Sequence, residues 1–262
     1  MKRIVIIIIS ISFLLSCRNQ KADTSTELES QDHLILAVLW FQSSAEMQAL
    51  FFQSYNIATE SLAKKLITKS NKKPKAVIMD IDETVLDNSP VEALSVLKNI
   101  PFSDSLWLSW VKKESAMVLP GAMDFIKYAD SAGVEIFYVS NRNSPTEFGP
   151  TLENLKRAGL PFADSLHLLL KTDVSSKEVR RNSVAENYDI LMLIGDNLAD
   201  FDQVFDNRGD DAGIGAVRNN KSRFGTDFIV LPNPMYGPWI NAAIKNQEGT
   251  MREKLLKVLR TD

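Results

Sequence analysis

The stretch Ala76-Val77-Ile78-Met79-Asp80-Ile81-Asp82-Glu83-Thr84 places two carboxylates directly after an apolar run. The run 76–79 predicts a buried strand, and open parallel sheets bind ligands at the carboxyl ends of their strands. Residues i and i+2 of an extended segment project to the same side, so we expect Asp80 and Asp82 to face one site. Such a pair indicates a nucleophile, a general acid or base, and a metal ion.

Further strand-like runs alternate with helical patterns along the rest of the chain. The runs are 135–139, 166–170, 190–194 and 227–231, and the helical patterns are 123–132, 146–158 and 175–187. This alternation predicts an α/β fold in which a parallel sheet is covered by helices on both faces. A chain of 262 residues that is 45% apolar can bury one substantial core with a smaller appended lobe.

Three segments do not fit the simple alternation. Residues 32–71 have apolar side chains at helical spacing, without Pro or Gly, and predict one or two helices that pack with a cap. The interval from about 86 to 119 is too long for a short crossover, so we interpret it as a helical cap inserted into a core that spans 72–262. The tail at 236–259 predicts a turn and a closing helix.

The amino terminus has the pattern of an export signal. Lys2-Arg3 precedes the apolar run 4–15, which is shorter than the roughly 20 residues that a membrane-spanning helix needs. The run ends in Leu14-Leu15-Ser16-Cys17, which resembles the lipobox of bacterial lipoproteins. We therefore expect a signal peptide at 1–16, a lipidated Cys17 and a flexible polar tether at 17–31. Cys17 is the only cysteine, so no disulfide is expected.

Export and lipidation would anchor the mature protein to a bacterial membrane through Cys17. Arg18 after the cysteine, rather than Asp, is compatible with the outer membrane. Removing the signal leaves a net charge of about −5, which lacks the basic face that polymeric nucleic acid requires. The chain also has no Gly-rich nucleotide loop, GxSxG elbow or CxxC pair, and this excludes P-loop kinases, serine hydrolases and thiol redox enzymes.

Polar side chains follow four of the predicted strands. They are Asp80, Asp82 and Thr84 after the first, Ser140, Asn141 and Arg142 after the second, Lys171 after the third, and Asp196, Asn197 and Asp200 after the fourth. Each group alone occurs by chance in many proteins, but four groups in this order, each directly after an apolar run, do not. The carboxyl ends of parallel strands share one edge of a sheet, so we expect the four groups to meet.

This set of motifs resembles phosphatases of the haloacid dehalogenase superfamily, and more closely the class C acid phosphatases. The matching stretches are 80–84 with Leu86-Asp87-Asn88, Gly195 to Phe201, Leu39 to Glu46, and Leu231 to Trp239. That family consists of bacterial lipoproteins that remove phosphate from 5′-nucleotides and other phosphomonoesters. The resemblance spans nearly the whole mature chain and implies a Rossmannoid parallel sheet with a smaller helical cap.

The resemblance also implies a mechanism. A carboxylate nucleophile and a phosphate ester repel each other, so a divalent cation is needed, and oxygen ligands suit Mg²⁺. The ligands would be the carboxylates of Asp80 and Asp196 and the main-chain carbonyl of Asp82. Asp80 would attack phosphorus to give an aspartyl-phosphate. The Asp82 side chain would serve as general acid and base, worth about 10²–10⁴ in rate, and a protonated Asp82 favours a low working pH.

Four further residues are expected to bind phosphate or to support those that do: Ser140, Asn141, Lys171 and Asp200. Donors of this kind stabilise charge that spreads over the phosphoryl oxygens. Asp200 would orient metal-bound water or Lys171, although it could also be a solvated helix carboxylate. Arg142 could either reach the phosphate or brace its loop through an ion pair, and the sequence leaves both open.

Substrate preference would depend on the cap. A nucleobase needs flat surfaces for stacking, and the resemblance points to Trp107 and Tyr236, which could instead be ordinary packing residues. Two other functions stay open: a phosphatase of the same superfamily for sugar or other non-nucleotide phosphomonoesters, and a catalytically idle surface or storage protein. The resemblance also allows a homodimer, but the sequence does not determine the oligomeric state.

Overall fold

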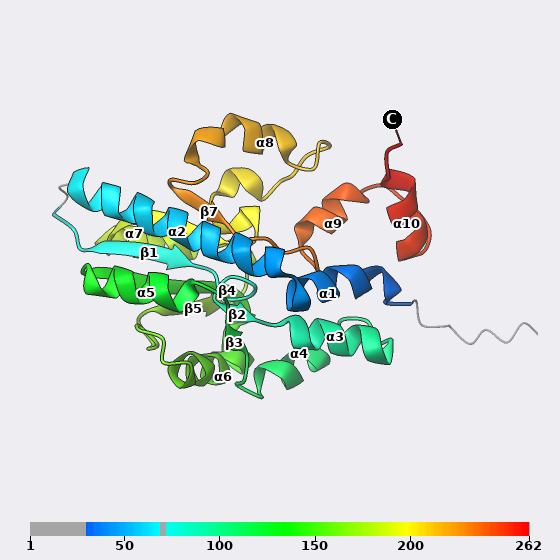
Figure 1. Ribbon diagram of the computed structural model, residues 1–262, viewed down its shortest axis with the longest axis horizontal. Coiled ribbons are helices and arrows are strands. Elements are labelled where there is room, and N and C mark those ends of the chain that lie inside the picture. Colours follow the sequence, from blue (N-terminus) through cyan, green and yellow to red (C-terminus); the bar gives the residue numbers. More distant parts are fainter. Residues whose placement is uncertain (1–29, 69–71, 262) are drawn as a thin grey trace, which may run out of the picture.

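The computed structural model describes residues 30–68 and 72–261 and contains a five-stranded parallel sheet (Figure 1). Its order is β5-β4-β1-β6-β7, formed by β1 (Lys75–Met79), β4 (Val134–Asn143), β5 (Leu168–Lys171), β6 (Asp189–Gly195) and β7 (Phe228–Val230). The central strand β1 pairs with β4 on one side and β6 on the other. The α/β fold predicted from the alternation of runs and helical patterns is confirmed.

Helices cover both faces of the sheet. The larger core lies on the face covered by α2 (Ala45–Thr68), α5 (Ala122–Ser131) and α6 (Ser144–Arg157), and it contains Val77 and Met79 of β1. The smaller core lies on the other face, against α7 (Glu178–Asn187), and contains the alternate β1 residues. A strand that is buried on both faces is continuously apolar, which is why the run before Asp80 shows no polar alternation.

The amino-terminal segment forms two helices with a short entry turn. The turn η1 (Asp32–Leu34) leads into α1 (Ile35–Ser43), and α2 follows after a break at Ser44, whose backbone is extended and whose hydroxyl accepts from the N–H of Met47 at 3.0 Å. Among the described residues no single helix is long and apolar enough to cross a membrane. By length and composition alone, the bent pair Asp32–Ser43 and Ala45–Thr68, at 63°, meets that test together.

A small lobe lies between β1 and α5, in the interval 86–119 where the sequence predicts a cap. Its strands β2 (Leu86–Asp87) and β3 (Met117–Val118) pair antiparallel, and between them lie α3 (Ser89–Lys98) and α4 (Asp104–Val111). Helix α1 runs alongside α3, so the amino-terminal segment packs on this lobe (Figure 1). The lobe begins at Leu86, six residues after Asp80, and therefore stands next to the end of β1.

The remaining elements follow β6 and β7. They are η2 (Leu198–Asp200), η3 (Gln203–Phe205), α8 (Ile214–Asn219), η4 (Lys221–Arg223), α9 (Pro238–Ala243) and α10 (Met251–Val258). The predicted closing helix is thus two short helices. The predicted signal peptide 1–16, Cys17 and most of the predicted tether 17–31 lie outside the described residues. Of the tether, Gln31 is buried and its N–H donates to Asn99 at 2.9 Å, so this residue belongs to the folded part.

Candidate active site

Three carboxylates meet at the carboxyl ends of β1 and β6. Asp80 follows β1, and its N–H donates to the carbonyl of Ile194 in β6 at 2.9 Å. Asp196 follows β6, and Asp200 stands in the turn η2. One oxygen from each of Asp80, Asp196 and Asp200 lies within 4.8 Å of the others, and Asp80 and Asp200 are buried. The structure therefore brings together the first and fourth motifs, which are more than a hundred residues apart.

The turn after β6 is built to bring Asp200 back toward the strand. A Cβ atom on Gly195 would stand 2.2 Å from the Asp200 carboxylate, so only glycine permits this approach. The N–H of Asn197 donates to Oδ2 of Asp200 at 2.9 Å and closes the turn. Asn233 donates to Oδ2 of Asp196 at 2.8 Å and so fixes that carboxylate from the segment after β7.

The lysine that contacts these acids is Lys177, not Lys171. Lys177 is buried, and its Nζ lies 2.5 Å from Asp80 and 2.6 Å from Asp200. Lys171 is the last residue of β5, where it pairs with Asn143 in the sheet. The chain continues from there through a loop, and the lysine at the end of that loop, directly before α7, is the one that reaches the acids. The placement predicted for Lys171 is corrected accordingly.

The acid cluster carries more negative charge than its lysine balances. Burial raises the pKa of Asp80 to about 7, an effect that Lys177 opposes and Asp200 reinforces. Burial and the neighbouring Asp200 and Asp80 also raise the pKa of Asp196 well above its usual range. A divalent cation among these oxygens would supply the missing positive charge. Carboxylate oxygens are ligands that Mg²⁺ binds. The residues therefore fit the predicted ion, and the Asp82 carbonyl as a further ligand stays a prediction.

Asp82 is held by three neighbours beside this cluster. Arg142 donates to its Oδ1 through Nε at 2.9 Å and Nη2 at 2.8 Å, and Asn88 donates to the same oxygen at 2.8 Å. The hydroxyl of Ser140 donates to Oδ2 at 3.1 Å. Of the two roles left open for Arg142, the contacts favour the ion pair, because its guanidinium is buried against Asp82 and Thr151.

The two remaining residues of the second motif differ in exposure. Ser140 is buried, and its hydroxyl lies between Asp82 and the N–H of Arg142. Asn141 is exposed, and its Oδ1 accepts from Arg180 at 2.7 Å. Neither Lys177 nor Arg180 is among the site residues that the sequence predicts. No periodicity distinguishes them, because Lys177 lies in the loop before α7 and the path of that loop decides which cation reaches the acids.

The aromatic residues predicted for substrate binding come from different parts of the fold. Trp107 stands in α4, donates to Glu147 at 3.1 Å, and has the Arg142 guanidinium 5.4 Å from its ring centre. Tyr236 follows β7, and its carbonyl accepts from the Trp239 indole at 3.1 Å. Trp107 thus adjoins the residue that holds Asp82, and its stacking with Tyr236 on a substrate stays a prediction.

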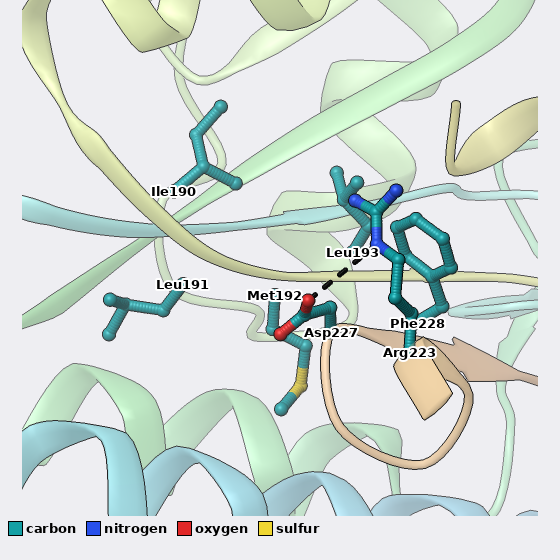
Figure 2. Close-up of a pocket in the computed structure, with 7 residues that line it drawn as sticks. All are labelled: Ile190, Leu191, Met192, Leu193, Arg223, Asp227 and Phe228. Atoms are coloured by element: carbon teal, nitrogen blue, oxygen red, sulfur yellow. Dashed lines mark ion pairs between the residues drawn. The ribbon is translucent and has the colours of Figure 1, made fainter. Parts of the chain in front are cut away.

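A cavity of about 130 Å³ lies elsewhere in the fold (Figure 2). Its lining residues are Ile190, Leu191, Met192, Leu193, Arg223, Asp227 and Phe228. Arg223 and Asp227 form an ion pair of 3.6 Å at its edge (Figure 2). The β6 residues of this lining precede the carboxyl end of the strand and the others come from 223–228, whereas Asp196 follows that end, so this cavity is separate from the acid cluster.

Comparison with known proteins connects this site to one family. The model of the HAD superfamily, subfamily IIIB (acid phosphatase), matches residues 6–239. The solved structure of the class C acid phosphatase from Bacillus anthracis superimposes with a TM-score of 0.81 at 40% sequence identity, and the match covers 88% of this chain and 98% of that one.

Curated plant proteins show a more distant similarity. A stem 31 kDa glycoprotein of Glycine max is 31% identical over 165 residues, which are 61% of this chain and 58% of the relative. Acid phosphatase 1 of Solanum lycopersicum is 29% identical over 167 residues, which are 61% of this chain and 57% of the relative. The chain therefore spans less than two thirds of the length of these relatives.

Proposed function

This chain belongs to subfamily IIIB of the HAD superfamily, the acid phosphatases, and we propose that it is a Mg²⁺-dependent phosphomonoesterase that acts on 5′-nucleotides. Membership of the class predicted from the four motifs is confirmed. The observation that carries the proposal is the meeting of Asp80, Asp196 and Asp200 around the buried Lys177. A nucleophilic acid, a cation site and a fixed positive charge in one place are what phosphoryl transfer requires.

The first chemical step uses Asp80 and Asp82. A carboxylate oxygen of Asp80 forms a bond to phosphorus while the bond from phosphorus to the ester oxygen breaks, and Asp82 gives its proton to the departing alkoxide. Arg142 and Asn88 occupy Oδ1 of Asp82 as donors, so the transferable proton belongs on Oδ2. There the Ser140 hydroxyl can donate to the charged form and accept from the protonated one.

The second step returns Asp80 to its starting form. Water attacks the phosphoryl group, Asp82 takes the proton of that water, and the bond between Asp80 and phosphorus breaks to release inorganic phosphate. Asp80 and Asp196 would hold the cation, which when bound neutralises charge at the reacting phosphate. Lys177 keeps Asp80 and Asp200 at a fixed distance throughout, because its ammonium contacts both.

Preference for a nucleotide is supported by the position of Trp107. Its ring lies in the cap lobe and adjoins Arg142, which in turn contacts Asp82, so an aromatic surface stands near the leaving-group side of the site. A nucleobase attached to the departing alkoxide would find there a ring on which to stack. The comparison that tests this preference is turnover of AMP against glycerol phosphate.

The proposal is tested with the purified protein. We expect phosphate release from AMP at mildly acidic pH, loss of release in EDTA, recovery with Mg²⁺, and loss again in Asp80→Asn. The thermal unfolding of Asp80→Asn is followed in parallel to show that this variant folds. Activity that persists in Asp80→Asn would contradict the nucleophile, and activity that is indifferent to EDTA would contradict the metal.

We also propose that the chain is exported and anchored to a bacterial membrane through lipid on Cys17. The support is the lipobox-like sequence at 14–17 after a signal-like run. Expression of the full chain in a bacterium should place it in the membrane fraction, and Cys17→Ser should move it to the soluble fraction. A Cys17→Ser variant that stays in the membrane fraction would contradict the anchor.

A further inference from the structure

Three cations at the start of α7 reach different parts of the site. Lys177 contacts the acid cluster, as described above. Arg181 is buried, and its Nη1 donates to the main-chain oxygens of Ala199 at 2.9 Å and Asp200 at 3.2 Å. Arg180 reaches the other way, to the carboxyl end of β4. One turn of chain thus connects the segments that carry the first, second and fourth motifs.

Arg180 joins the carboxyl end of β4 to the loop before α7 through one guanidinium group. Nη1 donates to the main-chain oxygen of Ser140 at 2.5 Å, and Nη2 donates to Oδ1 of Asn141 at 2.7 Å. Nη2 also lies 3.3 Å and 3.2 Å from the main-chain oxygens of Ser175 and Ser176, directly before Lys177. The end of β4 that carries Asn141 is therefore tied to the loop that delivers Lys177.

All four of these acceptors are uncharged. Among the described residues no carboxylate lies within ion-pair distance of Arg180, in contrast to Arg142, which pairs with Asp82. Burial lowers the pKa of Arg180 from its usual value, and the nearby charge of Asp80 opposes that change. A guanidinium stays protonated in proteins, so Arg180 carries a positive charge on a planar group. All of its hydrogen bonds hold main-chain and amide oxygens of neighbouring segments in place.

The contact with Arg180 fixes the orientation of the Asn141 amide. A guanidinium has donors only, so the oxygen of Asn141 must face it and the amino group must face away. That Nδ2 group has no hydrogen-bond partner among the described residues, and Asn141 is exposed. The amide therefore has a free N–H donor at the carboxyl end of β4. Strand β1, which Asp80 follows, is the neighbour of β4 in the sheet.

We propose that Arg180 is a positioning residue for phosphate binding, which acts by holding the Asn141 amide so that its donor and the Lys177 loop face the same phosphoryl group. The inference rests on the proposed function, because it takes phosphate as the ligand. This positioning requires the planar guanidinium group and not only its positive charge. A single ammonium group at this position cannot reach oxygens in both segments at once.

The experiment is a double-mutant cycle with Arg180→Lys, Asn141→Ala and the double variant. Affinity for inorganic phosphate is measured by calorimetry in the presence of Mg²⁺, and kcat and KM for AMP are measured in parallel. We expect each single variant to weaken phosphate binding by about 10- to 100-fold, the range for a lost hydrogen bond to a charged group. The double variant should be within about twofold of the weaker single variant, because both changes remove the same donor.

Controls separate positioning from folding and from net charge. Arg252→Gln, on the exposed face of α10, removes one positive charge as Arg180→Gln does. We expect the Arg252→Gln variant to bind phosphate like the wild type. Thermal unfolding is followed for every variant, and Arg180→Gln replaces Arg180→Lys in the cycle if the lysine variant does not fold. Wild-type affinity in Arg180→Lys, or losses that multiply in the double variant, would overturn the positioning role.

Failure of this inference is distinct from failure of the proposed function. Phosphate binding that depends on the cycle as expected, without release of phosphate from AMP, would support the positioning role and contradict the phosphatase. Turnover of AMP with multiplicative losses in the cycle would contradict the positioning role alone. A wild-type protein that neither binds phosphate nor turns over AMP would contradict both.

Discussion

The ammonium group of Lys177 lies 2.5 Å from Oδ1 of Asp80, and only 5% of the lysine side chain is exposed. The same nitrogen lies 2.6 Å from Asp200, so one buried cation joins the first motif to the fourth. Opposite charges at this separation, away from water, interact more strongly than a surface pair. Lys177 is therefore the residue whose loss should most disturb the charge balance around the nucleophile.

Replacing Lys177 by Met should lower kcat for AMP by about 100- to 1000-fold, the range for loss of one preorganised charge-stabilising donor. Met keeps the apolar stem of the side chain and removes only the ammonium group. Lys171→Met is the matched control, since Lys171 is also a lysine beside the sheet edge but is not the one that contacts the acids. Steady-state kinetics that show an inactive Lys171→Met and an active Lys177→Met would contradict the assignment.

Lys171 and Lys177 differ in how far a sequence pattern can predict their positions. The apolar run 166–170 marks the end of β5 to within one residue, so it predicts Lys171 at the edge of the sheet. The following loop and its return to the sheet decide which side chain reaches the acids, and no periodicity encodes that return. The helical pattern predicted from 175 in fact begins at Glu178, because residues 175–177 belong to the loop.

Other parts of the fold and site were predictable because each depends on a local pattern. All five predicted strands and the three predicted helices that follow β1 are present, with ends that differ by up to four residues. Contacts between loops were not predictable. The pairing of Arg142 with Asp82 was one of two alternatives, and the Arg180 guanidinium joins an oxygen of β4 to oxygens whose positions depend on the loop before α7.

Asp82→Asn should accumulate the phosphorylated enzyme when the substrate is an aryl phosphate. A good leaving group departs without a proton, so the first step needs no acid, whereas the second step still needs a base to activate water. Rapid mixing should show a burst of the released phenol followed by a slow steady state. Mass spectrometry of acid-quenched protein should show one added phosphoryl group.

The control for this intermediate is the double variant Asp80→Asn with Asp82→Asn. It should show neither the burst nor the added mass, because the accepting carboxylate is gone. A burst that survives in the double variant would mean that phosphorus is bound elsewhere. Absence of a burst in Asp82→Asn alone, with the steady rate unchanged, would mean that Asp82 is not the base.

Trp107→Ala should lower kcat/KM for AMP about tenfold relative to glycerol phosphate, a typical effect of one lost stacking contact. The ratio between the two substrates is the readout, since the ring also adjoins Arg142 and its loss affects the whole site. Trp107→Phe keeps a flat ring and removes the indole donor to Glu147, so it should keep most of the preference. Equal losses for both substrates would contradict base stacking.

The stability of the cap lobe should depend on pH through Glu92 of α3. Burial raises the pKa of Glu92 to about 7 from an ordinary value of 4.5. Between these two values the folded state keeps a proton that the unfolded state has lost, so the free energy of unfolding falls as pH rises through this window and stays low above it. Glu92→Gln cannot ionise and should be more stable than the wild type by about 1–3 kcal/mol at pH 8, with no such advantage at pH 4. Urea unfolding of both proteins at the two pH values measures this difference, and a variant that is less stable than the wild type at pH 8 would show that the charged carboxylate stabilises the lobe.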